Sequence, residues 1–128
     1  MFRFVVFLVI STLLSSAVFA KRGNNYSRYY GVDFSEIKLD NGEFFGEADG
    51  FRRGLVVRVV VENKRVKTIE IVEHNEIGRQ YWQFPMDVIP PEIIKRQSTD
   101  ITTVSGATAT SCAILSAVEK ALLGEIEN

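Results

Sequence analysis

The run from Ser105 to Ser111 gathers hydroxyl side chains, a glycine and small residues immediately before a pattern typical of a helix. The helical stripe that follows, within Cys112 to Leu123, consists of Ile114, Leu115, Val118, Leu122 and Leu123, and Gly124 provides a C-terminal stop. Backbone N–H groups at a helix start lack intrahelical partners, and the helix dipole is positive there. The run therefore predicts a turn that can bind a phosphate group.

The same hydroxyls also fit a purely structural role. A serine or threonine at a helix start commonly accepts a hydrogen bond from an early N–H group, which stabilises the helix by about 1 kcal/mol. The residue pattern leaves helix capping and phosphate binding both open.

The sequence Ser105-Gly106-Ala107-Thr108, followed by Ala109-Thr110-Ser111, resembles the flavinylation motif of the FMN-binding domain family. That family includes components of two membrane complexes, the sodium-pumping NADH:quinone oxidoreductase and the Rnf complex. In it, a dedicated flavin transferase esterifies the threonine that closes the Ser-Gly-Ala-Thr run to the phosphate of FMN. The resemblance implies FMN as the cofactor and a flavin transferase as a maturation partner. It implies Thr108 as the attachment residue, with cofactor contacts from Ser105, Gly106, Ala107, Thr110 and Ser111. Thr102 stands where the family usually has an acidic residue.

A second informative stretch runs from Val72 to Gly78, where a predicted strand ends in a loop. The family carries a histidine, an acid and a glycine here, near the flavin, so the resemblance implies His74 and Glu76 as cofactor-binding residues. Ile77 replaces the Thr-Pro that often follows the acid. A histidine at a strand end is also commonly just exposed. As a pocket residue, His74 can donate a hydrogen bond to a flavin carbonyl.

The residues before these motifs predict an antiparallel sheet. Val32 to Leu39 has the pattern of a short strand, and the resemblance resumes at Asn41 to Ala48, an expected strand whose Gly46 is consistent with a bulge. Leu55 to Glu62 is the clearest strand, with valines on one face. Asn63-Lys64 predicts a tight turn into a strand over Val66 to Val72.

The residues between the sheet and the flavinylation motif contain aromatics and prolines. Tyr81, Trp82 and Phe84 are expected in a loop, where they either cover a flavin ring or pack in the core. Pro90-Pro91-Glu92 predicts the start of a short helix, which ends by Gln97 to Asp100. Together these elements predict an α+β fold, a twisted antiparallel sheet of about four or five strands with helices packed on it.

Residues 1–20 are typical of a secretory signal peptide, with Arg3, an apolar run from Phe4 to Leu14, and small residues before Lys21. An uncleaved membrane anchor is the alternative. The expected organisation is a signal peptide at 1–20, an N-terminal extension at 21–40 and an FMN-binding domain at 41–124. The expected location is extracytoplasmic, periplasmic or secreted, with membrane association as the alternative.

The amino-acid composition argues against two classes of function. A formal net charge of −1 argues against nucleic-acid binding, and one histidine with one cysteine argues against a Cys/His metal site. No nucleophile–base set or paired-carboxylate motif is apparent, so an electron-transfer protein is favoured over a stand-alone enzyme. The sequence and the resemblance together predict an exported flavoprotein electron carrier with FMN attached through a threonine phosphoester. The sequence does not identify its redox partner, and a membrane electron-transfer complex is one candidate. The alternative is an exported binding or sensory module of the same fold, with noncovalent flavin or none.

Overall fold

The computed structural model describes residues 26–124 of the chain, so the predicted signal peptide lies outside the described residues. The elements in chain order are η1 (Phe34–Glu36), β1 (Gly42–Ala48), β2 (Leu55–Glu62), β3 (Arg65–Glu73), α2 (Arg79–Arg96) and α3 (Thr108–Leu123). The arrangement is α+β, an antiparallel sheet with two long helices, as predicted. No helix between residues 26 and 124 is long and apolar enough to cross a membrane.

The sheet has three strands among the described residues, in the order β1-β2-β3, and the prediction of four or five was wrong. The difference lies in Val32 to Leu39, which contains the short 3-10 helix η1 instead of a strand. The Asp33 side chain accepts a hydrogen bond from the N–H group of Ser35 and caps this turn. Only Asp33 keeps a strand-like contact, an isolated bridge to Ser98. A local side-chain cap thus competes successfully with strand formation.

The β2–β3 hairpin is confirmed. Asn63 and Lys64 both have positive φ angles, 53° and 58°, as a tight two-residue hairpin turn requires. Leu55 and the valines of β2 alternate between buried and half-buried positions, so one face of the sheet forms the core. The partners shift register between Val60 and Val61, which keeps both Val66 and Ile69 buried on that face.

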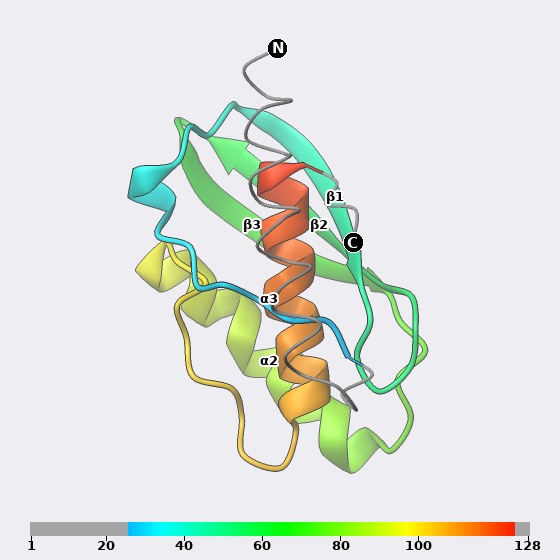
Figure 1. Ribbon diagram of the computed structural model, residues 1–128. Coiled ribbons are helices and arrows are strands. Elements are labelled where there is room, and N and C mark those ends of the chain that lie inside the picture. The colour runs from blue at the N-terminus through cyan, green and yellow to red at the C-terminus, as the bar shows by residue number, and fades with distance from the viewer. Residues whose placement is uncertain (1–25, 125–128) are drawn as a thin grey trace.

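Helix α3 lies across the buried face of the sheet, where it contacts β1 and β2, while α2 packs against α3 and β3 (Figure 1). Every residue from Thr110 to Glu119 is buried, so this helix is enclosed on all sides and is not simply amphipathic. The segment after Tyr26 crosses α3 on the side away from the sheet, which completes the enclosure (Figure 1).

Gly46 allows α3 to approach the sheet. Its pairing with Val57 is regular, so the expected bulge is absent, and the glycine serves the packing instead. A Cβ atom at Gly46 would overlap the carbonyl oxygen of Ala117 and approach the nitrogen of Ala121 to 2.7 Å. Only glycine permits this backbone contact between strand and helix.

Helix α2 begins at Arg79, eleven residues before the predicted start at Pro90, so that prediction was wrong. It contains three prolines, each of which removes a helical hydrogen bond. Pro85, Ile89 and Ile93 recur at four-residue spacing and are all buried, and this tertiary packing offsets the local preference of proline for a first turn. As a result Tyr81, Trp82 and Phe84 are helical residues, not loop residues.

Candidate functional site

Thr108 is the first residue of α3, and its side chain is exposed. The residue before it, Ala107, occupies the N-cap position and makes no side-chain capping bond. Gly106 has a φ angle of +80°, and a Cβ atom built there would meet no atom within 4 Å. The helix start is therefore uncapped, open and approachable along the backbone, which is the arrangement that binds a phosphate group.

Helix capping, the alternative for the hydroxyl-rich run, is not observed at this helix start. Ser111 instead secures the loop in front of it. Its hydroxyl donates to the carbonyl of Ala107 at 2.8 Å and accepts from the N–H group of Val104 at 3.1 Å. The four hydroxyls thus divide into two groups, with Ser105 and Thr108 exposed and Thr110 and Ser111 buried.

Glu76 joins three separate segments beneath this helix start. Its carboxylate accepts a hydrogen bond from the Thr110 hydroxyl at 2.5 Å, and others from the N–H groups of Phe51 at 3.0 Å and Arg52 at 2.9 Å. The residue is only 7% exposed, so these donors replace water around a buried charge. Glu76 therefore acts on the site by fixing the loop after β1 and the first turn of α3.

Gly50 lies directly against the Glu76 carboxylate. A Cβ atom there would lie 2.5 Å from Oε1 of Glu76, so the glycine leaves room for the carboxylate to reach the backbone of the loop. The side chain of Asn75 holds the far end of this loop through a bond to the carbonyl of Arg53 at 2.9 Å. The sequence indicated Glu76 but not its partners. The partners are backbone N–H groups 24 and 25 residues away, and every residue type except proline has such a group.

His74 lies beside α2. Its Nδ1 accepts a hydrogen bond from the N–H group of Glu76 at 3.1 Å, and its ring is 4.7 Å from that of Trp82, at a 55° tilt. A proton on the neutral ring therefore sits on Nε2. His74 lines a groove of about 470 Å³ between β3 and α2 together with Ile71, Trp82 and Met86. Thr108 is not among the residues that line this groove.

Large apolar side chains are exposed on the loops that Glu76 organises and on the start of α2. They are Phe51, Ile77, Tyr81 and Phe84, each at least half exposed. Glu76 ties the loop after β3 to the first turn of α3, and Asn75 ties it to the loop after β1. Exposed apolar side chains of this kind suit contact with a planar aromatic group.

Glu119 is a second buried carboxylate, which sequence reasoning missed. It accepts hydrogen bonds from the N–H groups of Tyr30 and Gly31 and, at 2.6 Å, from the Thr99 hydroxyl. Burial raises the pKa of Glu119 above its usual value, although these hydrogen bonds oppose the rise. One feature of the sequence could have indicated this buried carboxylate: Glu119 is a charged residue next to Val118, on the apolar face of a predicted helix.

The family comparison agrees with this site. The model of the FMN-binding domain family matches residues 50–123, more than half of the chain. The matched region contains both the Glu76 loop and the start of α3. The chain therefore belongs to the FMN-binding domain family, and its cofactor is FMN.

A comparison with individual proteins also finds a relative of this chain. An uncharacterized protein of Treponema pallidum (strain Nichols) is 33% identical over 88 residues, which are 69% of this chain. The matched stretch is 24% of that relative, so the chain spans only about a quarter of its length.

Proposed function

We propose that this protein is an exported electron carrier whose FMN is attached covalently through a phosphoester to Thr108. The observation that carries the proposal is the exposed Thr108 hydroxyl at the first position of an uncapped 16-residue helix. The ester retains one negative charge, which the helix N-terminus stabilises by about 0.3–1 kcal/mol. The open space around Gly106 admits a bulky group next to the backbone.

When bound, the flavin supplies transfer of one or two electrons, and the protein supplies attachment and orientation. Glu76 and Ser111 hold the loop and helix start in place through their hydrogen bonds. The exposed side chains of Phe51, Ile77 and Tyr81 offer an apolar surface for a ring tethered at this end. His74 retains Nε2 as a donor toward a flavin carbonyl.

Covalent attachment is consistent with export. A flavin held only by noncovalent contacts outside the cytoplasm would be lost by dilution whenever it dissociated. The proposal therefore includes the N-terminal export signal, a flavin transferase for maturation and a redox partner on another polypeptide.

The test is the intact mass of the protein purified from a host that expresses its export signal and a flavin transferase. We expect wild type to carry the mass of one FMN less one water, and Thr108→Ala to carry none. Thr68→Ala is the matched control, because Thr68 lies on the sheet and should leave the modification unchanged.

Two outcomes count against the proposal. If the transferase modifies a known acceptor but leaves this protein bare, covalent attachment is wrong and the noncovalent binding module replaces it. If Thr108→Ala still carries the added mass, the attachment residue is wrong.

A further inference from the structure

We propose that the free edge of β1 binds an extended, basic segment of a partner protein as a fourth strand of the sheet. The inference does not depend on the flavin or on Thr108. It rests on a groove of about 480 Å³ along β1, lined by Glu43 to Glu47 of that strand, by Val56 of β2, and by Lys120, Ala121 and the following Gly124 at the end of α3.

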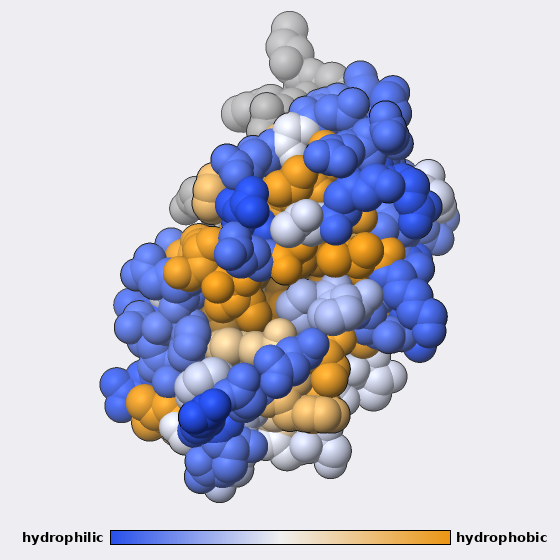
Figure 2. Space-filling model, turned by 180° about the vertical axis from the view of Figure 1, so that it is seen from behind, coloured by the Kyte–Doolittle hydropathy of each residue, from blue (hydrophilic) through white to orange (hydrophobic). Residues whose placement is uncertain are grey.

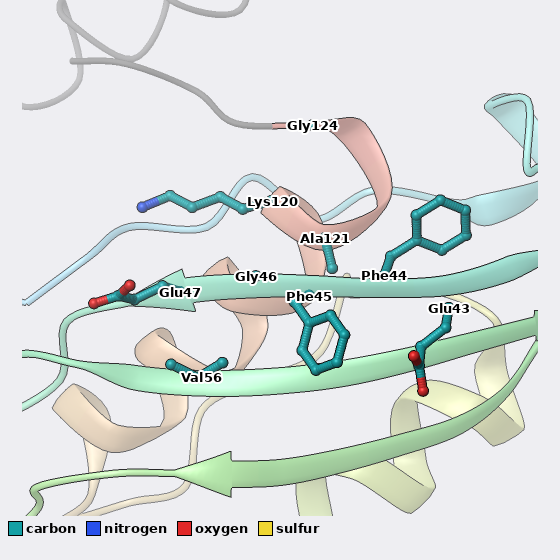
Figure 3. Close-up of a pocket in the computed structure, with 9 residues that line it drawn as sticks. All are labelled: Glu43, Phe44, Phe45, Gly46, Glu47, Val56, Lys120, Ala121 and Gly124. Carbon is teal, nitrogen blue, oxygen red and sulfur yellow. The ribbon is translucent and has the colours of Figure 1, made fainter.

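Figure 3 shows how the groove is built. Glu43 and Phe45 lie over the outer face of the sheet, while Ala121 and Lys120 emerge from the last turn of α3 beyond the edge of the strand. Five consecutive residues of one strand therefore line both sides of the edge. This is the surface that an added strand would contact.

The two edges of the sheet differ in what covers them. At the β3 edge, Gln97 at the end of α2 bonds the backbone of Val66 in both directions, at 3.0 Å and 2.9 Å. At the β1 edge, no strand between residues 26 and 124 pairs with Gly42 to Ala48 on the side away from β2. This strand is seven residues long, without a proline or a register shift. Alternate residues of such a strand direct backbone N–H and C=O groups outward, ready to pair.

The charged side chains on the outer face of the sheet indicate the chemistry of the partner strand. In the register of the sheet, the outer face carries five glutamates against two arginines and the exposed Lys67, which the register shift leaves unpaired, and Lys120 adds a cation on the α3 side of the groove. The arginines are Arg58 and Arg65, and the glutamates are Glu43, Glu47, Glu62, Glu70 and Glu73. Arg58 is already paired with Glu43 and Glu70. On its outward side, a strand laid beside β1 meets Glu43 and Glu47, which favours lysine or arginine at the facing positions of the partner.

Apolar groups lie between these charges. Phe45 is 57% exposed and stands between Glu43 and Glu47 on the outer side of β1. The view from behind shows apolar surface in the middle of the molecule with hydrophilic side chains around it (Figure 2). The pattern that fits is therefore basic, apolar, basic at alternate positions of the partner strand, with small or apolar residues between them that face Ala121.

A second copy of the chain fits less well. Two β1 strands paired antiparallel about Phe45 would place Glu43 of one copy opposite Glu47 of the other, and like charges directly opposite are destabilising. The charges thus favour a different, basic chain over self-association.

The test uses the mature chain and an acetylated, amidated peptide of sequence TKVVVKT, followed by residue-resolved NMR titration and amide hydrogen exchange. Its two lysines and central valine match the outer side of β1 in either strand direction. We expect amide shifts and slowed exchange at alternate residues of β1. A peptide with glutamate in place of both lysines should bind more weakly, as should one with N-methylated alternate residues.

Protein variants separate strand addition from general attraction. Glu47→Lys should weaken binding about two- to tenfold, as expected for reversing one cross-strand charge pair. Glu62→Lys is the matched control, because it makes the same charge change on the outer face at the end of β2, away from the groove. It should change affinity far less.

Several results would overturn the proposal. These are no shift in β1 at millimolar peptide, equal binding of the N-methylated peptide, or equal weakening by both variants. Protection, in the free protein, of the alternate β1 amides that point away from β2 would also overturn it. If sedimentation then shows a dimer, a second copy covers the edge, and if the protein is a monomer, another part of this chain does.

Discussion

The carboxylate of Glu76 accepts a hydrogen bond from the hydroxyl of Thr110 at 2.5 Å, across 34 residues of chain. This bond links the loop that follows the sheet to the first turn of the helix that begins with Thr108. Both residues were predicted to contact the cofactor, and the structure shows that they contact each other. Their role at the site is to position the backbone around Thr108, the proposed attachment residue.

Replacing Glu76 should destabilise the fold. Glu76→Ala removes the acceptor for two backbone N–H groups and one hydroxyl, which leaves buried donors without partners. We expect the free energy of unfolding to fall by about 3 kcal/mol or more, measured by urea denaturation. Glu73→Ala is the control, because Glu73 is exposed three residues earlier and should change stability by less than about 0.5 kcal/mol. Equal losses in the two variants would contradict the role assigned to Glu76.

The contact of Gly46 with α3 predicts a large effect from one methyl group. Gly46→Ala would place a Cβ atom against the carbonyl of Ala117, so strand and helix must move apart. We expect a loss of about 3 kcal/mol in unfolding free energy, at the upper end of overpacking effects. Glu47→Ala, the next residue on the exposed side, should be nearly neutral. A thermal or urea midpoint for Gly46→Ala equal to that of wild type would show that the helix does not pack this closely.

Cys112 is a built-in probe of local opening. It is the single cysteine of the chain, it is buried in α3, and burial raises the pKa of its thiol. Since the thiolate is the reactive form, labelling by a disulfide reagent at pH 8 should be slow in the native state. We expect a rate about a hundredfold or more below that of the protein in denaturant. Fast labelling without denaturant would mean that this part of α3 is accessible.

Glu119 predicts a dependence of stability on pH. Its pKa is raised chiefly by burial, so the folded state holds its proton more tightly than the unfolded state does. The stability that this proton contributes is full below the unfolded pKa, about 4.5, and is lost as pH rises through the native pKa. Denaturation of wild type and Glu119→Gln between pH 4 and 8 checks this. The advantage of wild type over the variant should shrink as pH rises, and an advantage that grows instead would mean a lowered pKa.

The residue at position 102 provides a test of the proposed recognition of this chain by a flavin transferase. Thr102 is exposed, so a carboxylate there costs little stability. If the acidic residue usual in the family aids recognition, Thr102→Asp should raise the flavinylated fraction above that of wild type, measured by intact mass. Thr102→Asn has nearly the same size without the charge and should not. Equal fractions in all three proteins would show that the acid is dispensable.

Local patterns in the sequence determined the hairpin and the last helix, and the resemblance to a family motif indicated Thr108 as the candidate attachment residue. The valines alternate at the period of a strand, Asn63-Lys64 suits the turn, and the hydroxyl-rich run precedes a helical stripe. These features depend on neighbours a few residues apart, so they can be recognised without the fold. Tertiary structure decided the rest. Helix α2 extends back through three prolines because Pro85, Ile89 and Ile93 are buried together. Glu76 and Glu119 acquired their roles from donors 20 to 89 residues away, and such contacts form only when the chain is folded.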